Sequence, residues 1–333
     1  MKLVALAESE DHVCARYRLA AFRAAFASAG HSLEIDALPQ SWFGKLTLGR
    51  DFADAVIVQR KLLSRLPLTL LRRRVRNLIF DFDDAVWLRD SYSAKGFDSS
   101  KRASRFRGIV QACDLVIAGN EYLATEARKW NPRVVVIPTC VDVAKYPLLA
   151  RPSRPHVQLV WVGSASTLRG LQQFAPTLSA IGRGVPGTRL KLICDRFIDI
   201  PNIAIDRCDW TEATETADIA DADIGIGWVP DDPWSRGKCG LKVLQYQAAG
   251  LPVIANSVGV QAEFVRDGVT GFQATTTEQW VDAVRKLAAD AALRHRLGMA
   301  GREQVETRYS AEAGGRMWLA ALERVHTISR KAG

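Results

Sequence analysis

Two lysines lie where the sequence predicts the start of a helix. Gly237-Lys-Cys-Gly240 is a turn bracketed by glycines, and a helical pattern follows it until Gly250 and Pro252 end it. A cation near a helix N-terminus opposes the helix dipole unless an anion is bound there. The free backbone N–H groups at such a terminus also bind phosphate. We interpret this stretch as a phosphate site made by Lys238, Cys239, Gly240, Leu241, Lys242 and Gln245.

The helical pattern also predicts which side of this helix faces a ligand. Leu241, Leu244 and Ala248 form an apolar stripe, so the opposite side, with Lys242 and Gln245, is expected to point away from the core. The alternative is a surface helix whose two lysines are merely solvated.

A second turn with phosphate-binding chemistry follows the apolar run at 159–162. It offers backbone N–H groups and hydroxyls that reach phosphate oxygens, and a basic residue suited to bidentate phosphate contact. Its residues are Gly163, Ser164, Ser166, Thr167 and Arg169. Glycine and serine also cap helices without any ligand, and the arginine could lie on the surface. The two turns together favour a diphosphate site.

Three acids follow the apolar run at 78–80. Asp81, Asp83 and Asp84 are stable so close together only if they are solvated, hydrogen-bonded, share protons or bind a metal. One interpretation is a magnesium-dependent phosphatase of the haloacid dehalogenase type, with Asp81 as nucleophile and Asp83 as acid/base, but no matching downstream Lys and acid pair occurs. Another is a metal-binding DxD motif. The interpretation that fits best has Asp83 or Asp84 accept a hydrogen bond from an acceptor hydroxyl. An ordinary capped turn is the remaining alternative.

Short apolar runs alternate with helical patterns along most of the chain. This alternation predicts α/β architecture with two parallel sheets, each covered by helices on both faces. A stretch rich in proline and polar residues, 150–156, reads as the linker between them. Helical patterns continue from Thr277 to the end, with expected breaks near Gly298 and between Tyr309 and Gly315.

Length and composition fit this organisation. The chain has 333 residues, enough for two domains, and six cysteines that are far apart and form no CxxC pair. We therefore expect neither a disulfide frame, nor a metal site, nor a bound cofactor, and a reducing cytosol suits the cysteines. The N-terminal apolar run is too short for a signal peptide and no run is long enough to span a membrane, so we expect a cytoplasmic protein.

The charge is unevenly distributed. The net charge is +9, and most of the excess lies in the first 150 residues. No helix-turn-helix, zinc-finger or RNP pattern accompanies it, so nucleic acid is not the expected partner. Basic residues surround the apolar run at 66–71, which suggests an anionic membrane surface or an acidic or lipid-linked glycan acceptor. A solvated basic helix is the alternative.

The stretch at 234–259 resembles the donor-binding element of retaining, family-4 type glycosyltransferases of the GT-B fold. That element usually reads Glu-Gly-Phe-Gly, then Leu, with a second Glu eight residues after the first. Here Gly237 and Gln245 stand at the two glutamate positions. The string Gly-Lys-Cys-Gly-x-Lys-x-x-Gln-Tyr is similar to that of a bacterial subgroup of the family.

The resemblance implies two doubly wound, Rossmann-like domains facing a cleft. Residues 1–150 would bind the acceptor, with a C-terminal helix at 312–330 packing back on them, and residues 151–311 would bind the nucleotide sugar. The acceptor side would include Arg16, Tyr17, Arg18 and Asn120. The implied activity is transfer of a sugar from a nucleotide-diphosphate sugar to a hydroxyl of a glycan, lipid or small molecule, with retention and without metal. A role in cell-envelope polysaccharide synthesis, at the inner face of the membrane, would follow.

Two other functions stay open at this point. One is the magnesium-dependent phosphatase that would use Asp81 and Asp83. The other is a non-catalytic protein that binds nucleotide sugars, because the usual glutamates are absent. Fold alone does not separate these functions.

Overall fold

The chain forms two compact units. The computed structural model describes residues 1–38, 53–149 and 156–331. The first unit comprises Met1–Cys140, Asp232–Cys239 and Ala311–Gly333, and the second comprises Val141–Asp231 and Gly240–Ser310. The linker predicted at 150–156 lies, except for its last residue, outside the described residues. The short segment 232–239 thus leaves the second unit and belongs to the first.

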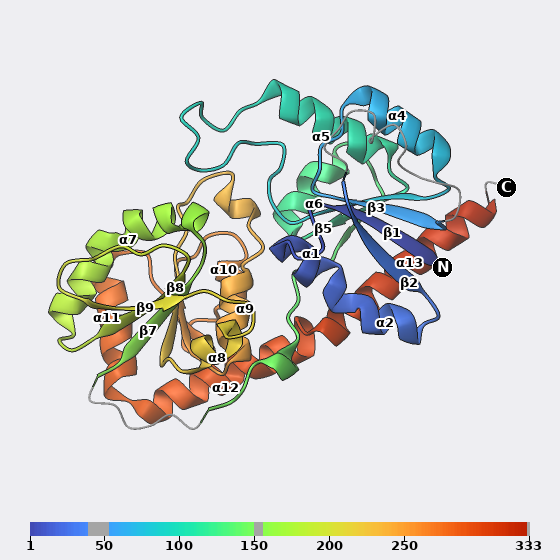
Figure 1. The fold of residues 1–333 in the computed structure, drawn as a ribbon. Coiled ribbons are helices and arrows are strands. Elements are labelled where there is room, and N and C mark those ends of the chain that lie inside the picture. Colours follow the sequence, from blue (N-terminus) through green and yellow to red (C-terminus); the bar gives the residue numbers. More distant parts are fainter. Residues whose placement is uncertain (39–52, 150–155, 332–333) are drawn as a thin grey trace. The chain divides into compact units, whose positions relative to one another are not determined.

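A six-stranded parallel sheet forms the centre of the first unit (Figure 1). Its strand order is β2-β1-β3-β4-β5-β6. The strands are β1 (Lys2–Ala7), β2 (Ser32–Ala37), β3 (Ala55–Gln59), β4 (Leu78–Phe82), β5 (Leu115–Ala118) and β6 (Val134–Val136). Side chains of β1 alternate between the two faces of the sheet: Leu3 and Ala5 join one apolar core and Leu6 joins the other. Both faces are therefore covered, as expected for a parallel sheet.

Helices pack on both faces of this sheet. They are α1 (Val13–Arg18), α2 (Arg23–Ser28), α4 (Arg65–Arg74), α5 (Ser100–Ala112), α6 (Glu121–Arg128) and α13 (Ala311–Lys331), with short 3-10 turns η1 (Ala20–Phe22) and η3 (Ser235–Gly237). Helix α13, drawn in red in Figure 1, runs beside α2. Its Trp318 is fully buried and meets Phe26 edge to face, with 6.0 Å between ring centroids. The last helix of the chain thus completes the core of the first unit.

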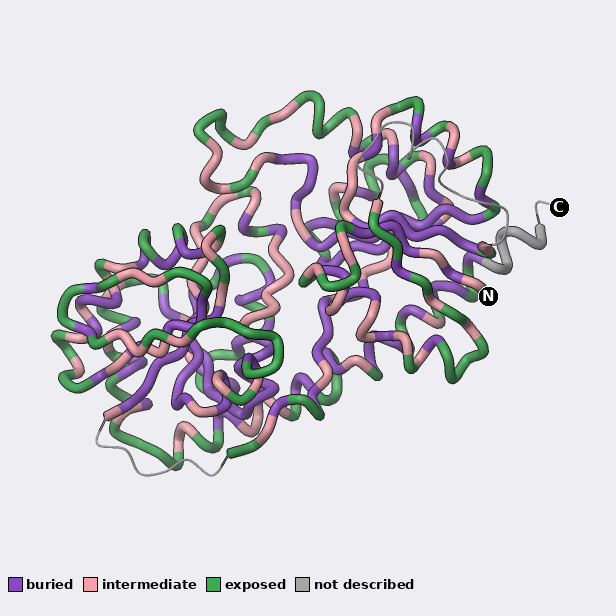
Figure 2. Tube along the Cα trace, in the orientation of Figure 1, coloured by how far each residue is buried: buried purple, intermediate pink, exposed green. Residues whose placement is uncertain are grey.

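The second unit has its own six-stranded parallel sheet. Its order is β12-β11-β10-β7-β8-β9, which is the strand order of dinucleotide-binding Rossmann folds. The strands are β7 (Gln158–Val162), β8 (Arg189–Cys194), β9 (Ala204–Asp209), β10 (Ile224–Gly227), β11 (Val253–Ala255) and β12 (Gly271–Gln273). The helices are α7 (Ala165–Gly184), α8 (Glu215–Ala220), α9 (Leu241–Ala248), α10 (Gln261–Phe264), α11 (Thr277–Ala289) and α12 (Ala291–Arg308), with η2 (Val143–Lys145). In Figure 2, buried backbone follows the strands of both sheets.

This architecture confirms the predicted fold class: two doubly wound sheets flanked by helices, as in GT-B proteins. Two details of the prediction were wrong. The strand expected to end at Phe80 continues to Phe82, so Asp81 lies inside β4 rather than in a turn. Gly298 does not interrupt a helix, because α12 runs through it without a break.

Strand order locates the ligand-binding edge of each sheet. In open parallel sheets, ligands bind beyond the carboxyl ends of the strands where the chain reverses direction across the sheet. In the first unit this point lies between β1 and β3, and in the second between β7 and β10. The residues that follow these strands are therefore the ones to inspect.

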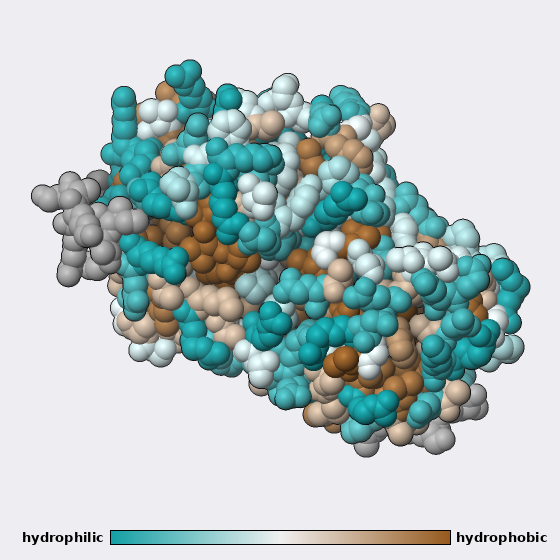
Figure 3. Space-filling model, turned by 180° about the vertical axis from the view of Figure 1, so that it is seen from behind, coloured by the Kyte–Doolittle hydropathy of each residue, from teal (hydrophilic) through white to brown (hydrophobic). Residues whose placement is uncertain are grey.

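On the face shown in Figure 3, hydrophilic side chains form most of the surface and hydrophobic ones appear in separate patches. Among the described residues, no helix is both long and apolar enough to cross a membrane.

Candidate active site

Glycine fixes the turn that begins helix α9. Gly240 is the N-cap residue and has a positive φ of 66°, a conformation that other residues rarely adopt. A Cβ at this position would lie 2.8 Å from the side chains of Val260 and Phe264. Leu241 and Lys242, the first two residues of the helix, are half-buried. The backbone N–H groups at the start of α9 therefore have a rigidly defined position.

The two predicted phosphate-binding turns meet at Trp161. The ammonium Nζ of Lys242 lies 3.8 Å from the centroid of the Trp161 ring. A Cβ on Gly163 would lie 2.3 Å from the same ring, so only glycine fits there. Trp161 itself is buried on strand β7. The sequence analysis did not single it out, because a tryptophan in a buried strand looks like ordinary core.

The interior of α9 corrects the predicted polar side. Every residue from Val243 to Ala248 is buried, and Gln245 is only 2% exposed. Gln247 lies in the core and donates a hydrogen bond to the carbonyl oxygen of Phe264 at 2.8 Å. Because buried amides find partners within the protein, glutamine here does not mark a ligand-facing surface. Only Leu241 and Lys242, at the start of α9, are partly accessible.

The Gly163 turn caps helix α7. The backbone N–H of Ser164 donates to Thr167 Oγ1 at 3.1 Å, and the hydroxyls of Ser164 and Ser166 lie 2.8 Å apart. Both serines are exposed, as is Arg169. The backbone N–H of Ala165 already donates to a carboxylate oxygen of Asp195 at 2.6 Å. Capping accounts for Thr167, whereas the two serine hydroxyls and Arg169 remain accessible to a ligand.

Lys238 and Cys239 belong to the first unit rather than to the unit that contains Lys242. Asn120, the N-cap of α6, donates through Nδ2 to the carbonyl oxygens of Gly237 and Lys238 at 3.1 and 3.2 Å. Asn120 is 6% exposed. Its contacts hold the segment 232–239 against the first unit, a role that the sequence did not predict.

Arg18 and Asp81 form a buried ion pair. The Arg18 guanidinium donates to both carboxylate oxygens, with Nη2 at 2.6 Å from Oδ1 and Nε at 3.0 Å from Oδ2. It also donates to the carbonyl oxygen of Ile137 at 3.0 Å. Both side chains are essentially inaccessible. Although burial opposes its charge, Asp81 raises the pKa of Arg18, so the guanidinium stays protonated. This places Arg18 in the core, while Arg16 and Tyr17 are half-buried neighbours on α1.

Asp83 and Asp84 share Arg60, which follows strand β3. The Arg60 Nε lies 3.3 Å from Asp83 Oδ1, and Nη2 forms an ion pair with Asp84 Oδ2. Burial opposes the charge of Arg60, but the two carboxylates outweigh it and raise its pKa. Burial and the charge of Asp83 raise the pKa of Asp84 above its ordinary value. Asp83 Oδ1 is buried and, within the described part of the chain, accepts no hydrogen bond.

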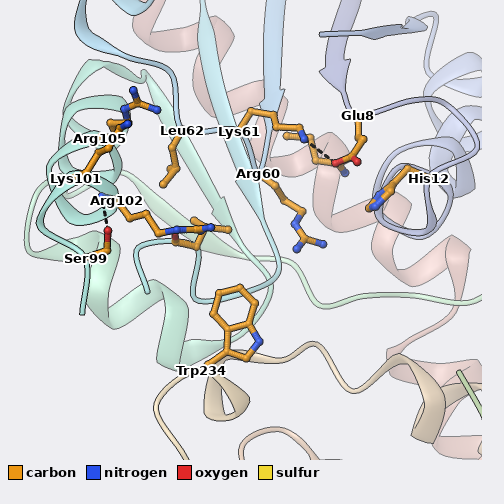
Figure 4. A pocket seen from close by; sticks show the side chains of 12 residues that line it. Glu8, His12, Arg60, Lys61, Leu62, Ser99, Lys101, Arg102, Arg105 and Trp234 are labelled. Atoms are coloured by element: carbon orange, nitrogen blue, oxygen red, sulfur yellow. Dashed lines mark hydrogen bonds and ion pairs between the residues drawn. The ribbon is translucent and has the colours of Figure 1, made fainter. Parts of the chain in front are cut away.

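A cavity of about 550 Å³ opens at the β1–β3 edge of the first unit (Figure 4). Arg60 extends into it from β3, between His12 of the α1 side and Trp234 of the segment 232–239. The remaining lining residues are Glu8, Gln59, Lys61, Leu62, Val86, Ser99, Lys101, Arg102 and Arg105. Sequence reasoning missed this cavity, because its cations come from two separate segments and only strand order brings them together.

The predicted membrane-facing helix turns its apolar side inward. In α4, Pro67, Leu68 and Leu71 are buried in the core and Leu66 is 51% exposed. Arg72 pairs with Asp114 at 3.1 Å. An anionic surface that contacts α4 would therefore interact with its exposed arginines more than with its leucines.

The described residues include no group of three or more His, Cys, Asp or Glu side chains placed to hold a metal ion. None of the six cysteines is in a disulfide: Cys14, Cys113, Cys140 and Cys194 are buried, and Cys208 and Cys239 are half-buried.

Known proteins resemble this chain in sequence mainly around α9. Residues 233–304 match the model of the family "Glycosyl transferases group 1". Over these residues the chain is similar to group 1 glycosyltransferases. The matched segment contains Gly240, Lys242 and all of α9. The chain is also similar to the D-inositol 3-phosphate glycosyltransferase of Nocardioides sp., 35% identical over 95 residues. That match spans 28% of this chain and 20% of the relative, so the chain aligns with about one fifth of its length.

Solved glycosyltransferase structures share the whole fold. Sucrose-phosphate synthase from Thermosynechococcus elongatus superposes with a TM-score of 0.77 at 14% identity, covering 98% of this chain and 100% of that one. HepE of Anabaena, solved in complex with UDP-glucose, superposes with a TM-score of 0.68 at 14% identity, covering 97% and 99% of the two chains. At this identity the likeness shows a GT-B fold, and the reaction must be argued from the site.

Proposed function

We propose that the chain transfers a sugar from a nucleotide-diphosphate sugar to a hydroxyl acceptor, with retention and without a bound metal. The observation that carries this proposal is the meeting of the Gly163 turn and Lys242 on Trp161, within and beside the segment that matches the glycosyltransferase family. The complex of HepE with UDP-glucose makes UDP-sugars the first donors to test.

The second unit supplies the groups that stabilise a leaving diphosphate. As the bond from the anomeric carbon to the diphosphate breaks, negative charge builds on the phosphate oxygens. Lys242, the N–H groups of the first turn of α9 and the hydroxyls of Ser164 and Ser166 present positive charge and donors to such oxygens. Lys242 rests on the Trp161 ring and so needs little rearrangement to meet the anion.

The first unit supplies the acceptor side. Asp83 Oδ1 is buried and accepts no hydrogen bond from the described residues, so it can accept one from a sugar hydroxyl. Arg60 pairs with it and neutralises part of its charge, and Asp84 holds the Arg60 guanidinium in place. We assign acceptor orientation to Asp83 and a supporting role to Asp84. A glycan or lipid-linked acceptor in cell-envelope polysaccharide synthesis is consistent with this assignment.

The structure argues against the phosphatase. Its nucleophile would be Asp81, whose side chain is fully buried and whose two oxygens both accept hydrogen bonds from Arg18. A nucleophile must reach phosphorus in line with the leaving group, and this carboxylate is closed off from any substrate. The other alternative, a protein that binds nucleotide sugars without transferring the sugar, differs from the proposal only in lacking turnover of the donor.

The test is turnover of UDP-sugars by the purified chain, measured as UDP release with and without a mixture of glycosyl acceptors. We expect release to survive EDTA. Asp83→Asn should lower transfer at least tenfold and leave UDP affinity within about twofold. Tight UDP binding without any release would favour the non-catalytic protein. Strict magnesium dependence together with phosphate release from a generic phosphomonoester would instead restore the phosphatase.

A further inference from the structure

We propose that the cavity of the first unit recognises an acceptor that carries an anionic group, a phosphate or a carboxylate, near its reacting hydroxyl. This inference rests on the proposed function and names the acceptor class for it. The cavity lies beyond the carboxyl ends of β1 and β3, where ligands bind in doubly wound sheets. Its volume of about 550 Å³ lies in the range of roughly 300–1,000 Å³ typical of small-molecule sites.

Cations outnumber acids among the residues that line the cavity. Five side chains carry a full positive charge, and Glu8 is the one acid among the lining residues. Glu8 is already paired with Lys61 at 2.6 Å, a contact that lowers the pKa of this carboxylate. Arg60 is paired with Asp83 and Asp84. The nearby acids are thus committed to Arg60 and Lys61.

Three cations of helix α5 are left without an acidic partner among the described residues. Arg102 donates to the carbonyl oxygen of Val86 at 3.3 Å, and neither Lys101 nor Arg105 forms an ion pair in the described part of the chain. Lys101 and Arg105 are four residues apart, so they lie on the same side of the helix, next to Arg102. The three positive charges therefore concentrate on one wall of the cavity.

The position of these residues on the helix makes their charge unfavourable without a ligand. Ser99 caps α5, and the first turn contains Lys101 and Arg102 but no acid. Like charges on adjacent turns repel each other, and Lys101 and Arg102 also oppose the dipole at the helix N-terminus. An oxyanion placed against this wall would reduce both the repulsion between the cations and their unfavourable interaction with the helix dipole. It would also meet free backbone N–H groups. A neutral sugar would relieve neither.

Arg60 lies between this wall and Asp83, the carboxylate to which we assign acceptor orientation. It lines the cavity and also contacts Asp83, whose buried Oδ1 accepts no hydrogen bond from the described residues. An acceptor would therefore place its anionic group on the α5 wall and its hydroxyl on the Arg60 side. The charged group fixes orientation, and Asp83 selects the hydroxyl that reacts.

The first experiment measures binding without chemistry. Glucose, glucose 6-phosphate and glucuronate are titrated into the full chain by calorimetry at low and at physiological salt. We expect glucose 6-phosphate or glucuronate to bind at least tenfold more tightly than glucose, and the preference to fall as salt rises. Arg105→Gln and Lys101→Gln should each reduce anion affinity about tenfold. The matched control is Arg73→Gln, an exposed arginine of α4 that does not line the cavity.

The second experiment measures transfer from UDP-glucose to the same three acceptors. Arg105→Gln should raise KM for the anionic acceptors, whereas Arg73→Gln should leave KM and UDP-glucose hydrolysis without acceptor unchanged. Equal binding of glucose and its anionic derivatives, or equal loss in Arg73→Gln, overturns the inference. If the chain never turns over UDP-sugars but still prefers the anionic probes through Arg105, the proposed function fails while anion recognition stands. Comparing glucose 6-phosphate with glucuronate shows whether the α5 cations prefer a phosphate or a carboxylate.

Discussion

Arg60 combines a strained backbone with three polar contacts. Its φ is +57°, in the left-handed region that non-glycine residues avoid, at a typical cost of about 1–3 kcal/mol. Its guanidinium contacts Asp83, Asp84 and the Cys14 thiol, which lie on separate segments of the first unit. The strain is therefore maintained by contacts that fix one guanidinium orientation. No local pattern around residue 60 predicts these contacts, because the partners come from α1 and from the residues that follow β4.

Lys242 gives the most direct test of the donor site. Lys242→Ala should weaken UDP binding about tenfold to a hundredfold, because a charge-assisted contact to phosphate is worth roughly 1.5–3 kcal/mol. The contact with Trp161 implies a small loss of stability as well, about 0.5–1 kcal/mol. The helix-dipole argument alone would predict a slight gain. Calorimetric titration with UDP and urea denaturation measure the two effects separately.

Lys286→Ala is the matched control for Lys242→Ala. Lys286 lies in the second unit with its Nζ 5.7 Å from the Phe272 ring centroid, so the substitution removes the same charge and a similar contact. It lies near the end of α11, outside the residues of both turns. We expect UDP affinity within twofold of the parent. Equal loss of affinity in the two variants would show that Lys242 acts only through overall charge.

His12 predicts a pH dependence of stability. Burial lowers the pKa of His12 below its ordinary value of 6.5, and its Nδ1 accepts a hydrogen bond from the N–H of Cys14 at 3.3 Å. The unfolded chain therefore binds this proton more readily than the folded chain. The contribution of neutral His12 to the free energy of unfolding is fully present above pH 6.5 and is lost as the pH falls through the lowered pKa. Asparagine caps helices and does not titrate, so His12→Asn should lose less stability between pH 7.5 and 5.5 in urea denaturation. An unchanged pH profile would contradict the assignment.

At the scale of elements, the sequence predicted the central strands and missed two edge strands. Strands β3 and β5 are buried throughout, so their apolar runs stand out. Strand β2 lies at the edge of its sheet with most residues exposed, and β12 is an edge strand of three residues. Edge strands need no continuous apolar run, because one side and much of each face meet water. The sequence therefore indicated the fold but not every edge strand, since β2 and β12 were missed.

Gly298 shows how packing between elements overrides a local rule. Replacing a glycine inside a helix by alanine usually stabilises by roughly 0.5–1 kcal/mol. Here a Cβ would lie 2.0 Å from the carbonyl oxygen of Gly250, which is backbone and cannot move aside cheaply. We expect Gly298→Ala to destabilise the chain by about 1–3 kcal/mol or more. Thermal and urea denaturation of the full chain measure this.

Gly301 of the same helix provides the comparison. A Cβ there would lie 3.0 Å from Cγ of Gln247, which is a buried side chain rather than backbone. Gly301→Ala should therefore cost less than Gly298→Ala, because the side chain can shift while the carbonyl cannot. If both variants are as stable as the parent, helix propensity outweighs the close contact and the prediction fails.

At the scale of the whole molecule, each unit is assembled from separate segments of chain. The first unit contains three segments and the second contains two. The alternation of strands and helices predicted two domains, but it could not assign the segment 232–239 to the first unit. That assignment depends on Asn120 and on Tyr122, whose hydroxyl donates to the carbonyl oxygen of Pro233 at 3.0 Å. These are single polar contacts between residues over 100 positions apart, and no sequence period reveals them.

Two buried tryptophans test whether the units unfold separately. Trp318 of α13 is fully buried against Phe22 and Phe26 in the first unit. Trp280 of α11 is 1% exposed and meets Phe174 in the second unit, with 4.6 Å between ring centroids. Truncating a buried tryptophan to alanine costs about 3–5 kcal/mol. The two substitutions are thus matched in size and differ in the unit they affect.

Hydrogen exchange followed by mass spectrometry measures the two units separately, because each peptide reports on the unit to which it belongs. In Trp318→Ala we expect faster exchange in β1, β3, α2 and α13, and little change in β7 to β12. Trp280→Ala should show the reverse pattern. The prediction depends on each apolar core lying within one unit, so that a cavity weakens only the segments that line it. If either substitution raises exchange equally in both sheets, the chain unfolds as one cooperative body, and its four crossings between the units would then couple them more strongly than their cores do.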